Sequence, residues 1–179
     1  MRSCPHFKPA FNIDLLLSYN FISHLGVYRR EILKQIGGFR VGFEGSQDHD
    51  LALRTVLESS PDQIIHIPRV LYHWRAHSES TASNPDSKDY TTESGHKAVQ
   101  HFLDEQHRRG GVRATARIKA RNRFTCQWHT PEKSPSVELI IPTRDQAEVL
   151  NLAVDSILAK TKYTNYTCLL YTSDAADES

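Results

Sequence analysis

The fold is decided by the stretch Gly37-Gly38-Phe39-Arg40-Val41-Gly42-Phe43-Glu44-Gly45-Ser46-Gln47-Asp48-His49-Asp50-Leu51-Ala52-Leu53-Arg54. Its leading glycines predict the end of a helix over residues 29–36, because glycine adopts the left-handed conformation that closes helices. Ser46 is a residue type that caps helix N-termini, so a second helix is expected over residues 48–59. Its Leu53, Val56 and Leu57 would lie on one face.

Outward along the chain, apolar runs and turn signals alternate. Residues 63–67 and 70–74 are expected to be strands, interrupted by Pro68, which cannot donate to a ladder. Residues 83–95 are polar and rich in helix breakers, which predicts a surface connection. A helix over residues 93–109 then ends at Gly110 and Gly111. Residues 116–128 alternate apolar with mostly cationic side chains, which predicts one half-buried strand with a solvated cationic face.

A second α/β unit is predicted near the C-terminus. Residues 137–141 form an apolar strand that runs into Pro142-Thr143-Arg144-Asp145. Asp145 and Glu148 have the spacing of a capping box for the helix that follows. The apolar residues of this helix, which share one face, are Leu150, Val154, Ile157 and Leu158. A buried strand, a short loop and a helix open an α/β domain, so the expected fold class is α/β.

Composition excludes several classes of protein. The 179 residues are 39% hydrophobic and 24% charged, as in an ordinary globular chain. Lys and Arg total 22 against 21 Asp and Glu, which excludes a generally basic nucleic-acid binder, so no nucleic-acid partner is expected. The three cysteines lack metal-type or disulfide-scaffold spacing, which favours a reducing cytoplasm. Apolar runs are far shorter than the ~20 residues that span a bilayer.

The glycine-rich stretch resembles a known family. Together with Pro9-Ala10-Phe11-Asn12 and Leu15-Leu16-Leu17-Ser18-Tyr19-Asn20, it looks like the back half of the Rossmann-like GT-A fold of family 2 glycosyltransferases, of the rhamnosyltransferase or O-antigen type. The resemblance implies that Asp48 is the catalytic base of an inverting transfer. It also implies a supporting or acceptor-side position for Gln47, Asp50, Gly45 and Phe43.

The chemistry requires such a base, because the attacking hydroxyl loses its proton as the new bond forms. The alternative is that Asp48 and Asp50 only complement the positive end of a helix dipole, worth about 0.3–1 kcal/mol each. Phe43 could stack on a sugar or fill the core, and the glycines could approach a ligand or simply form a turn.

The segment Arg75-Ala76-His77-Ser78-Glu79-Ser80 resembles the Arg-x-His-x-x-Ser segment that closes over the donor in relatives. The resemblance implies that Arg75 clamps the donor diphosphate and that His77 contacts phosphate or a metal, with His73 as the alternative. A zinc site formed by His73 and His77 is not expected, because the two lie about 13 Å apart in an extended chain.

The resemblance further implies a divalent Mg or Mn ion in the intact parent. The Asp-x-Asp motif that binds it in relatives is absent from this chain before Asn12, and the one present, Asp48-His49-Asp50, lies in the acceptor motif. Residues 137–145 and 153–163 resemble the first strand and helix of another GT-A domain, which implies that Pro142, Thr143 and Asp145 lie against a nucleotide. Asp145 is explained equally well as an N-cap.

Four segments follow from these observations. Residues 1–82 are expected to be the C-terminal half of a first glycosyltransferase domain, 83–135 an inter-domain linker with a helix and a basic strand, and 136–167 the start of a second domain. Residues 168–179 resemble the translation of a sequencing adapter and are expected to replace the second strand of that domain.

The expected function is a fragment of an inverting glycosyltransferase in cell-surface polysaccharide synthesis, inactive alone. Its partners would be a nucleotide-sugar donor and a glycan or lipid-linked glycan acceptor. The resemblance is also compatible with peripheral association of the protein with the inner face of the plasma membrane. The alternative is a non-catalytic carbohydrate-binding or scaffolding domain. A third hypothesis takes residues 108–123, rich in Lys and Arg, as a site for RNA or anionic lipid.

Overall fold

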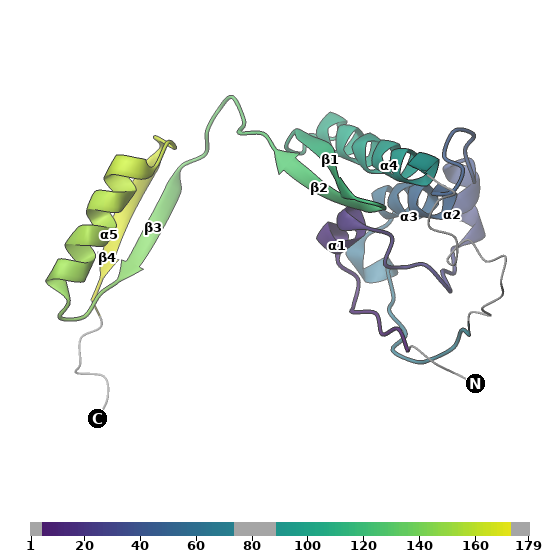
Figure 1. Cartoon of the computed structure of the whole chain (residues 1–179), viewed down its shortest axis with the longest axis horizontal. Coiled ribbons are helices and arrows are strands. Elements are labelled where there is room, and N and C mark those ends of the chain that lie inside the picture. The colour runs from purple at the N-terminus through teal and green to yellow at the C-terminus, as the bar shows by residue number, and fades with distance from the viewer. Residues whose placement is uncertain (1–4, 74–88, 173–179) are drawn as a thin grey trace. The chain divides into compact units, whose positions relative to one another are not determined.

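The computed structural model describes residues 5–73 and 89–172, which fall into two compact units, Met1–His129 and Thr130–Ser179 (Figure 1). The elements of the first unit are α1 (Ile13–Ser18), α2 (Arg30–Gln35), α3 (Gln47–Leu57), the 3₁₀ turn η1 (Pro61–Gln63), α4 (Asp89–Arg108), β1 (Ala114–Ala120) and β2 (Arg123–Trp128). Those of the second are β3 (Val137–Pro142), α5 (Ala147–Lys160) and β4 (Tyr166–Tyr171).

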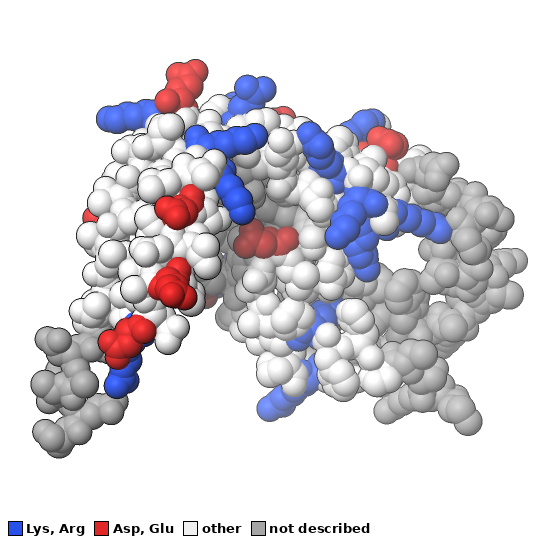
Figure 2. All heavy atoms as spheres, turned by 60° about the vertical axis from the view of Figure 1, so that its left-hand side comes forward, with Lys and Arg blue, Asp and Glu red and all other residues white. Residues whose placement is uncertain are grey.

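The described chain is a mixed α/β structure with small sheets. Both of its sheets have two strands, one antiparallel and one parallel, and the described ranges contain no larger sheet. The face drawn in Figure 2 carries Lys and Arg side chains interspersed with Asp and Glu. No described helix is both long enough and apolar enough to cross a membrane.

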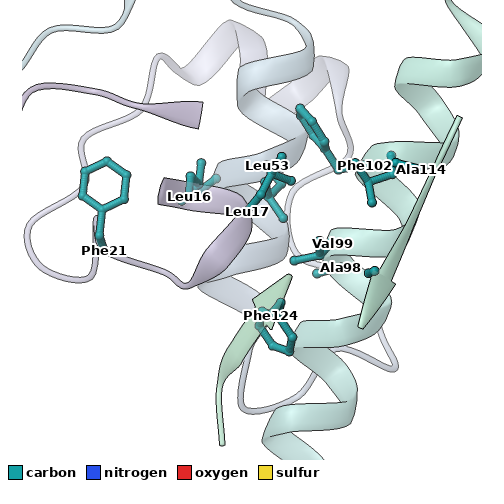
Figure 3. Packing of buried hydrophobic residues seen from close by; sticks show 12 residues of the cluster. Leu16, Leu17, Phe21, Leu53, Ala98, Val99, Phe102, Ala114 and Phe124 are labelled. Carbon is teal, nitrogen blue, oxygen red and sulfur yellow. The ribbon is translucent and has the colours of Figure 1, made fainter. Parts of the chain in front are cut away.

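The core of the first unit lies where α1, α3, α4 and the β1–β2 hairpin meet (Figure 3). Helix α4 contributes a stripe of apolar residues at helical spacing, because it must bury one face to be stable. The buried cluster consists of Leu16, Leu17, Phe21, Ala52, Leu53, Ala98, Val99, Phe102, Leu103, Ala114, Ala116 and Phe124. Val56 and Leu57 pack against it half-buried, as the sequence pattern of α3 predicts.

The predicted single strand over residues 116–128 is wrong, because the structure has a hairpin there. β1 and β2 are antiparallel, with Ala116 opposite Cys126 and Ile118 opposite Phe124. The chain reverses at Asn122, whose φ of +51° lies in the left-handed region that asparagine tolerates. Alternation continues through the turn because these opposed residues share a face.

Residues 89–129 belong to the first unit, where the sequence suggested a linker and a surface connection. Helix α4 begins at Asp89, and Thr91, Thr92 and Ser94 in its first turns are buried. A Cβ atom on Gly95 would lie 2.7 Å from Cζ of Phe124, so only glycine lets β2 approach α4 this closely. The described residues 89–129 are thus packed as part of the first unit.

The two predicted strands after α3 are also wrong within the described residues. The chain from residue 64 to 73 has no regular structure, and Ile65 and Val70 are 79% and 66% exposed. A strand needs a neighbour for its backbone groups. Within the described ranges, neither sheet includes residues 63–73. Trp74, the expected last strand residue, lies outside the described residues.

In the second unit, β3 pairs in parallel with β4, and α5 connects them. Asp145 is not the N-cap that the capping-box spacing predicts. Its φ is +50°, and the helix begins after Gln146 without a side-chain cap. The expected loss of the second strand is corrected as well, since residues 166–171 form β4, which extends into the adapter-like segment. Leu150, Val154 and Ile157 are half-buried, but Leu158 is exposed.

We expect Leu53→Ala to lower the free energy of unfolding of the first unit by about 2–5 kcal/mol, because it empties a filled core position. Leu53 is 1% exposed and belongs to the buried cluster that residues of α1, α4, β1 and β2 complete. Urea unfolding followed by circular dichroism measures the change. Leu71→Ala, at a residue that is 66% exposed, is the control and is expected to stay within about 0.5 kcal/mol of wild type. Equal losses for both variants would contradict this core.

Candidate functional site

Asp48 lies in the first turn of α3 with its side chain exposed. Its Oδ2 accepts a hydrogen bond of 2.9 Å from Nδ2 of Asn20, and its Oδ1 accepts one of 2.9 Å from the backbone N–H of His49. The Asn20 amide is itself held, because its Oδ1 accepts from the N–H of Ser23 at 3.2 Å. The carboxylate is therefore fixed in orientation and still open to solvent.

His49 anchors the start of α3 to the core. It is 3% exposed, its Nε2 lies 2.7 Å from the carbonyl oxygen of Leu16, and its ring stacks on Phe124. Burial lowers the pKa of His49, so the ring is neutral near pH 7 and Nε2 donates to that carbonyl. Ser46 stands at the N-cap position as predicted, but its hydroxyl donates to the carbonyl of Thr91 at 2.7 Å instead of capping the helix.

Asp50 is 1% exposed and lies between two guanidinium groups. Nε of Arg54 donates to its Oδ2 at 2.9 Å, and Arg40 donates to both carboxylate oxygens. Arg54 also donates to the carbonyls of Ile36, at 2.7 Å, and Gly38 at the end of α2. This buried ion cluster fastens the glycine-rich loop 37–45 to α3, the helix that carries Asp48 in its first turn.

The other residues predicted on the acceptor side have local structural contacts. Phe43 is half-buried, packs against the core and carries the guanidinium of Arg40 at 4.2 Å from its ring centre. Gly45 has a φ of +80°, and a Cβ there would lie 2.6 Å from Cγ2 of Thr91. Gln47 is exposed at the first position of α3. The loop is thus shaped by close packing, with Gln47 and Asp48 at its solvent side.

Two residues beside Asp48 were not singled out from the sequence. Asn20 ends the quoted run 15–20, but its contact with a residue 28 positions away has no local signal. Tyr28 is half-buried, and burial together with the negative charge of Asp48 raises the pKa of its phenol. Asn20, Tyr28 and Asp48 therefore form a polar group at the start of α3.

We expect Asp48→Asn to lower the pKa of Tyr28 toward its ordinary value, because a neutral amide no longer opposes the phenolate. NMR titration of tyrosine labelled at Cζ measures this shift, with Tyr28→Phe identifying the resonance. Glu44→Gln removes an exposed carboxylate from the same loop and should leave the Tyr28 titration unchanged. An unaltered Tyr28 in Asp48→Asn would mean that the two groups do not face each other.

The described residues do not form a metal centre. Across residues 5–73 and 89–172, no group of three His, Cys, Asp or Glu side chains is placed to hold an ion. Within Asp48-His49-Asp50, both oxygens of Asp50 are occupied by arginines, which does not suit a cation ligand. His73 is exposed in irregular chain, and Arg75 and His77 lie outside the described residues.

In the second unit, a shallow depression of about 210 Å³ is lined by Pro142, Thr143, Arg144 and Tyr171. It lies at the carboxyl ends of β3 and β4, where the N–H of Thr143 donates to the carbonyl of Tyr171 at 2.8 Å. Ligands of open parallel sheets bind at such ends. Of the predicted nucleotide residues, Pro142 and Thr143 line the depression, whereas exposed Asp145 is not among its lining residues.

Curated proteins similar to this chain include two bacterial ones. The uncharacterized protein y4gI of Sinorhizobium fredii is 40% identical over 170 residues, which cover 92% of this chain and 18% of that protein. The O-antigen biosynthesis protein RfbC of Myxococcus xanthus is 38% identical over 174 residues, 97% of this chain and 13% of RfbC. The chain is homologous to a short part of each. It spans less than a fifth of either relative's length.

No family model matches the chain, and no solved structure matches it. The match to RfbC covers 97% of this chain. The residues that it leaves uncovered are fewer than those in the segment 168–179, so the similarity continues into that segment. The adapter-like origin of residues 168–179 stays a prediction.

Proposed function

We propose that this chain is part of an inverting family 2 glycosyltransferase with a GT-A fold that acts in cell-surface polysaccharide synthesis, and that Asp48 is its general base. The proposal draws on the similarity to a short part of RfbC, whose name states O-antigen biosynthesis. The observation that carries it is the contrast within one helix turn, in which Asp48 is exposed while His49 and Asp50 are buried and held.

This contrast suits a base better than a helix-dipole partner. A dipole partner needs only to lie near the helix end, whereas a base needs a fixed carboxylate that an acceptor hydroxyl can reach. Each oxygen of Asp48 accepts one hydrogen bond, from Asn20 or from the N–H of His49, which leaves lone pairs on the solvent side.

In the proposed reaction, the acceptor hydroxyl approaches the free side of the Asp48 carboxylate. Asp48 takes its proton while the hydroxyl oxygen attacks the anomeric carbon of the donor sugar. The bond from that carbon to the nucleoside diphosphate breaks, and the diphosphate leaves with the bonding electrons. Asp48 ends the step protonated and returns the proton to water. Gln47, at the solvent side of the same turn, is proposed to contact the acceptor.

The donor side of the proposal rests on the resemblance alone. Arg75 and His77 would contact the diphosphate, and Pro142, Thr143 and Asp145 a nucleotide in the second unit. The Mg or Mn ion would be held by residues other than the described ones, which do not fit it. We place the intact protein in the cytoplasm, where nucleotide sugars are made available to a glycan or lipid-linked glycan acceptor.

The test is to recover the intact parent protein and to measure release of nucleoside diphosphate from a panel of nucleotide sugars, with and without glycan acceptors. We expect release that depends on the acceptor and yields the inverted linkage. Glycan binding without release for any donor would favour the alternative, a non-catalytic carbohydrate-binding or scaffolding domain.

A further inference from the structure

The β1–β2 hairpin carries a concentration of positive charge. Between Gln106 and Pro131 the chain contains no Asp or Glu. The hairpin cations with exposed side chains are Arg113, Arg117, Lys119, Arg121 and Arg123. Among the described residues, no carboxylate forms an ion pair with Arg113, Arg117 or Lys119. The arginines at the C-terminal end of α4 differ, since Arg108, its last residue, pairs with Glu105, and Arg109, which follows it, pairs with Glu58.

The hairpin register separates this charge from the apolar side chains. Ala116 lies opposite Cys126 and Ile118 opposite Phe124, and this face packs on the core. Arg117 lies opposite Thr125 on the outer face. Burial raises the pKa of Cys126, and the negative charge of Asp14 of α1 raises it further, so Asp14 lies toward the inner face. The outer face is left cationic.

Apolar side chains remain partly exposed at the ends of the hairpin. Trp128 is 54% exposed at the end where it pairs with Ala114, and Val112 nearby is 45% exposed. Ile118, toward the other end, is 43% exposed. Trp128 and Ile118 lie on the same face of the hairpin as Ala116 and Phe124, so the outer face that carries Arg117 offers charge and not apolar contacts.

We propose that the outer face of the β1–β2 hairpin binds anionic phospholipid headgroups and rests the first unit on a membrane surface. Basic clusters are drawn to anionic membranes, each Lys or Arg near the surface adding to the affinity. RNA fits this face less well, because single strands stack on aromatic rings interleaved with cations. Here Phe124 is 3% exposed and Trp128 belongs to the apolar set. The proposal does not depend on Asp48 or on any catalytic activity.

The test is flotation of the full chain with vesicles of phosphatidylcholine alone and of phosphatidylcholine mixed with phosphatidylglycerol, after removal of aggregates. We expect binding to the anionic vesicles at least about tenfold tighter than to the neutral ones, and weaker as salt rises. The double variant Arg117→Glu/Lys119→Glu should lose about tenfold or more of this affinity.

The matched control is Arg30→Glu/Lys34→Glu, which changes net charge equally at exposed residues of α2 and should bind within about twofold of wild type. Arg117→Gln/Lys119→Gln, which adds no acid, gives the same answer if the reversal variant fails to fold by circular dichroism. Equal binding to neutral vesicles, or equal loss in the α2 control, would overturn the proposal. So would hairpin-dependent binding of single-stranded RNA without binding to anionic vesicles.

Discussion

Replacing Asp50 by asparagine is expected to lower the free energy of unfolding of the first unit by about 3–5 kcal/mol, the cost of breaking a buried ion pair by removing one partner. Arg54 is 7% exposed and would be left without its counter-charge. The amide NH₂ of asparagine would also point a donor at a guanidinium group. Since Arg54 holds the carbonyls of Ile36 and Gly38, the glycine-rich loop should loosen as well.

The measurement is urea unfolding of the 179-residue chain followed by far-ultraviolet circular dichroism. Asp48→Asn is the matched control, because it makes the same chemical change two residues away at an exposed position. Its loss should stay at about 1 kcal/mol or less, the size of a helix-dipole interaction. If both variants lose the same small amount, Asp50 does not hold a buried ion cluster.

As acids at a helix start these two aspartates are alike, and the sequence distinguishes them only through the family resemblance. The structure shows that one is exposed and the other buried. The pairing of Asp50 with Arg54 follows from their spacing of four residues on a helix. The pairing with Arg40 does not, because Arg40 comes from a loop whose path depends on Gly42 and Gly45. Burial of Asp50 also depends on contacts that no local pattern records.

Elements with strong end signals were predicted well. Gly37 and Gly38 follow the end of α2, and Gly110 and Gly111 follow that of α4, each close to the expected residue. The hairpin was missed because the alternation of period two keeps its phase on both sides of Asn122, which is a weaker turn signal than glycine. The strands expected at residues 63–67 and 70–74 failed for another reason. Apolar alternation predicts which side chains a strand would bury, but it does not show whether a neighbouring strand is present to pair with its backbone.

The site was predictable in part. Asp48 was singled out through a long motif, and the structure shows it exposed before two buried neighbours, while its catalytic role stays a prediction. Its hydrogen bond from Asn20 and its effect on Tyr28 required tertiary structure, because both partners come from the chain before α2. Contacts between residues that are far apart in the chain leave no local pattern in the sequence, so they could not be predicted from it.

Asp48→Asn in the intact parent protein should reduce turnover by about 10² to 10⁴, the range lost when a general base is removed. Asparagine keeps the size of the side chain, and its Oδ1 can still accept one of the two hydrogen bonds, so the start of α3 should stay in place. Donor binding should barely change, because the proton acceptor acts on the acceptor hydroxyl.

The control is Glu44→Gln, which removes an exposed carboxylate of the same loop while keeping an oxygen that can accept from the N–H of Gly42. It should turn over within about twofold of wild type, as expected for a carboxylate outside the proton transfer. Asp50→Asn cannot serve, because its effect on folding would obscure any effect on chemistry.

The measurement that tests the central claim most directly is the rate of sugar transfer by the Asp48→Asn parent at saturating donor and acceptor, alongside its donor affinity. We predict a loss of about 10² to 10⁴ in turnover with donor affinity preserved. A variant that turns over within a few-fold of wild type, with at most about 1 kcal/mol lost in stability, would contradict the claim and leave Asp48 as a helix-dipole partner.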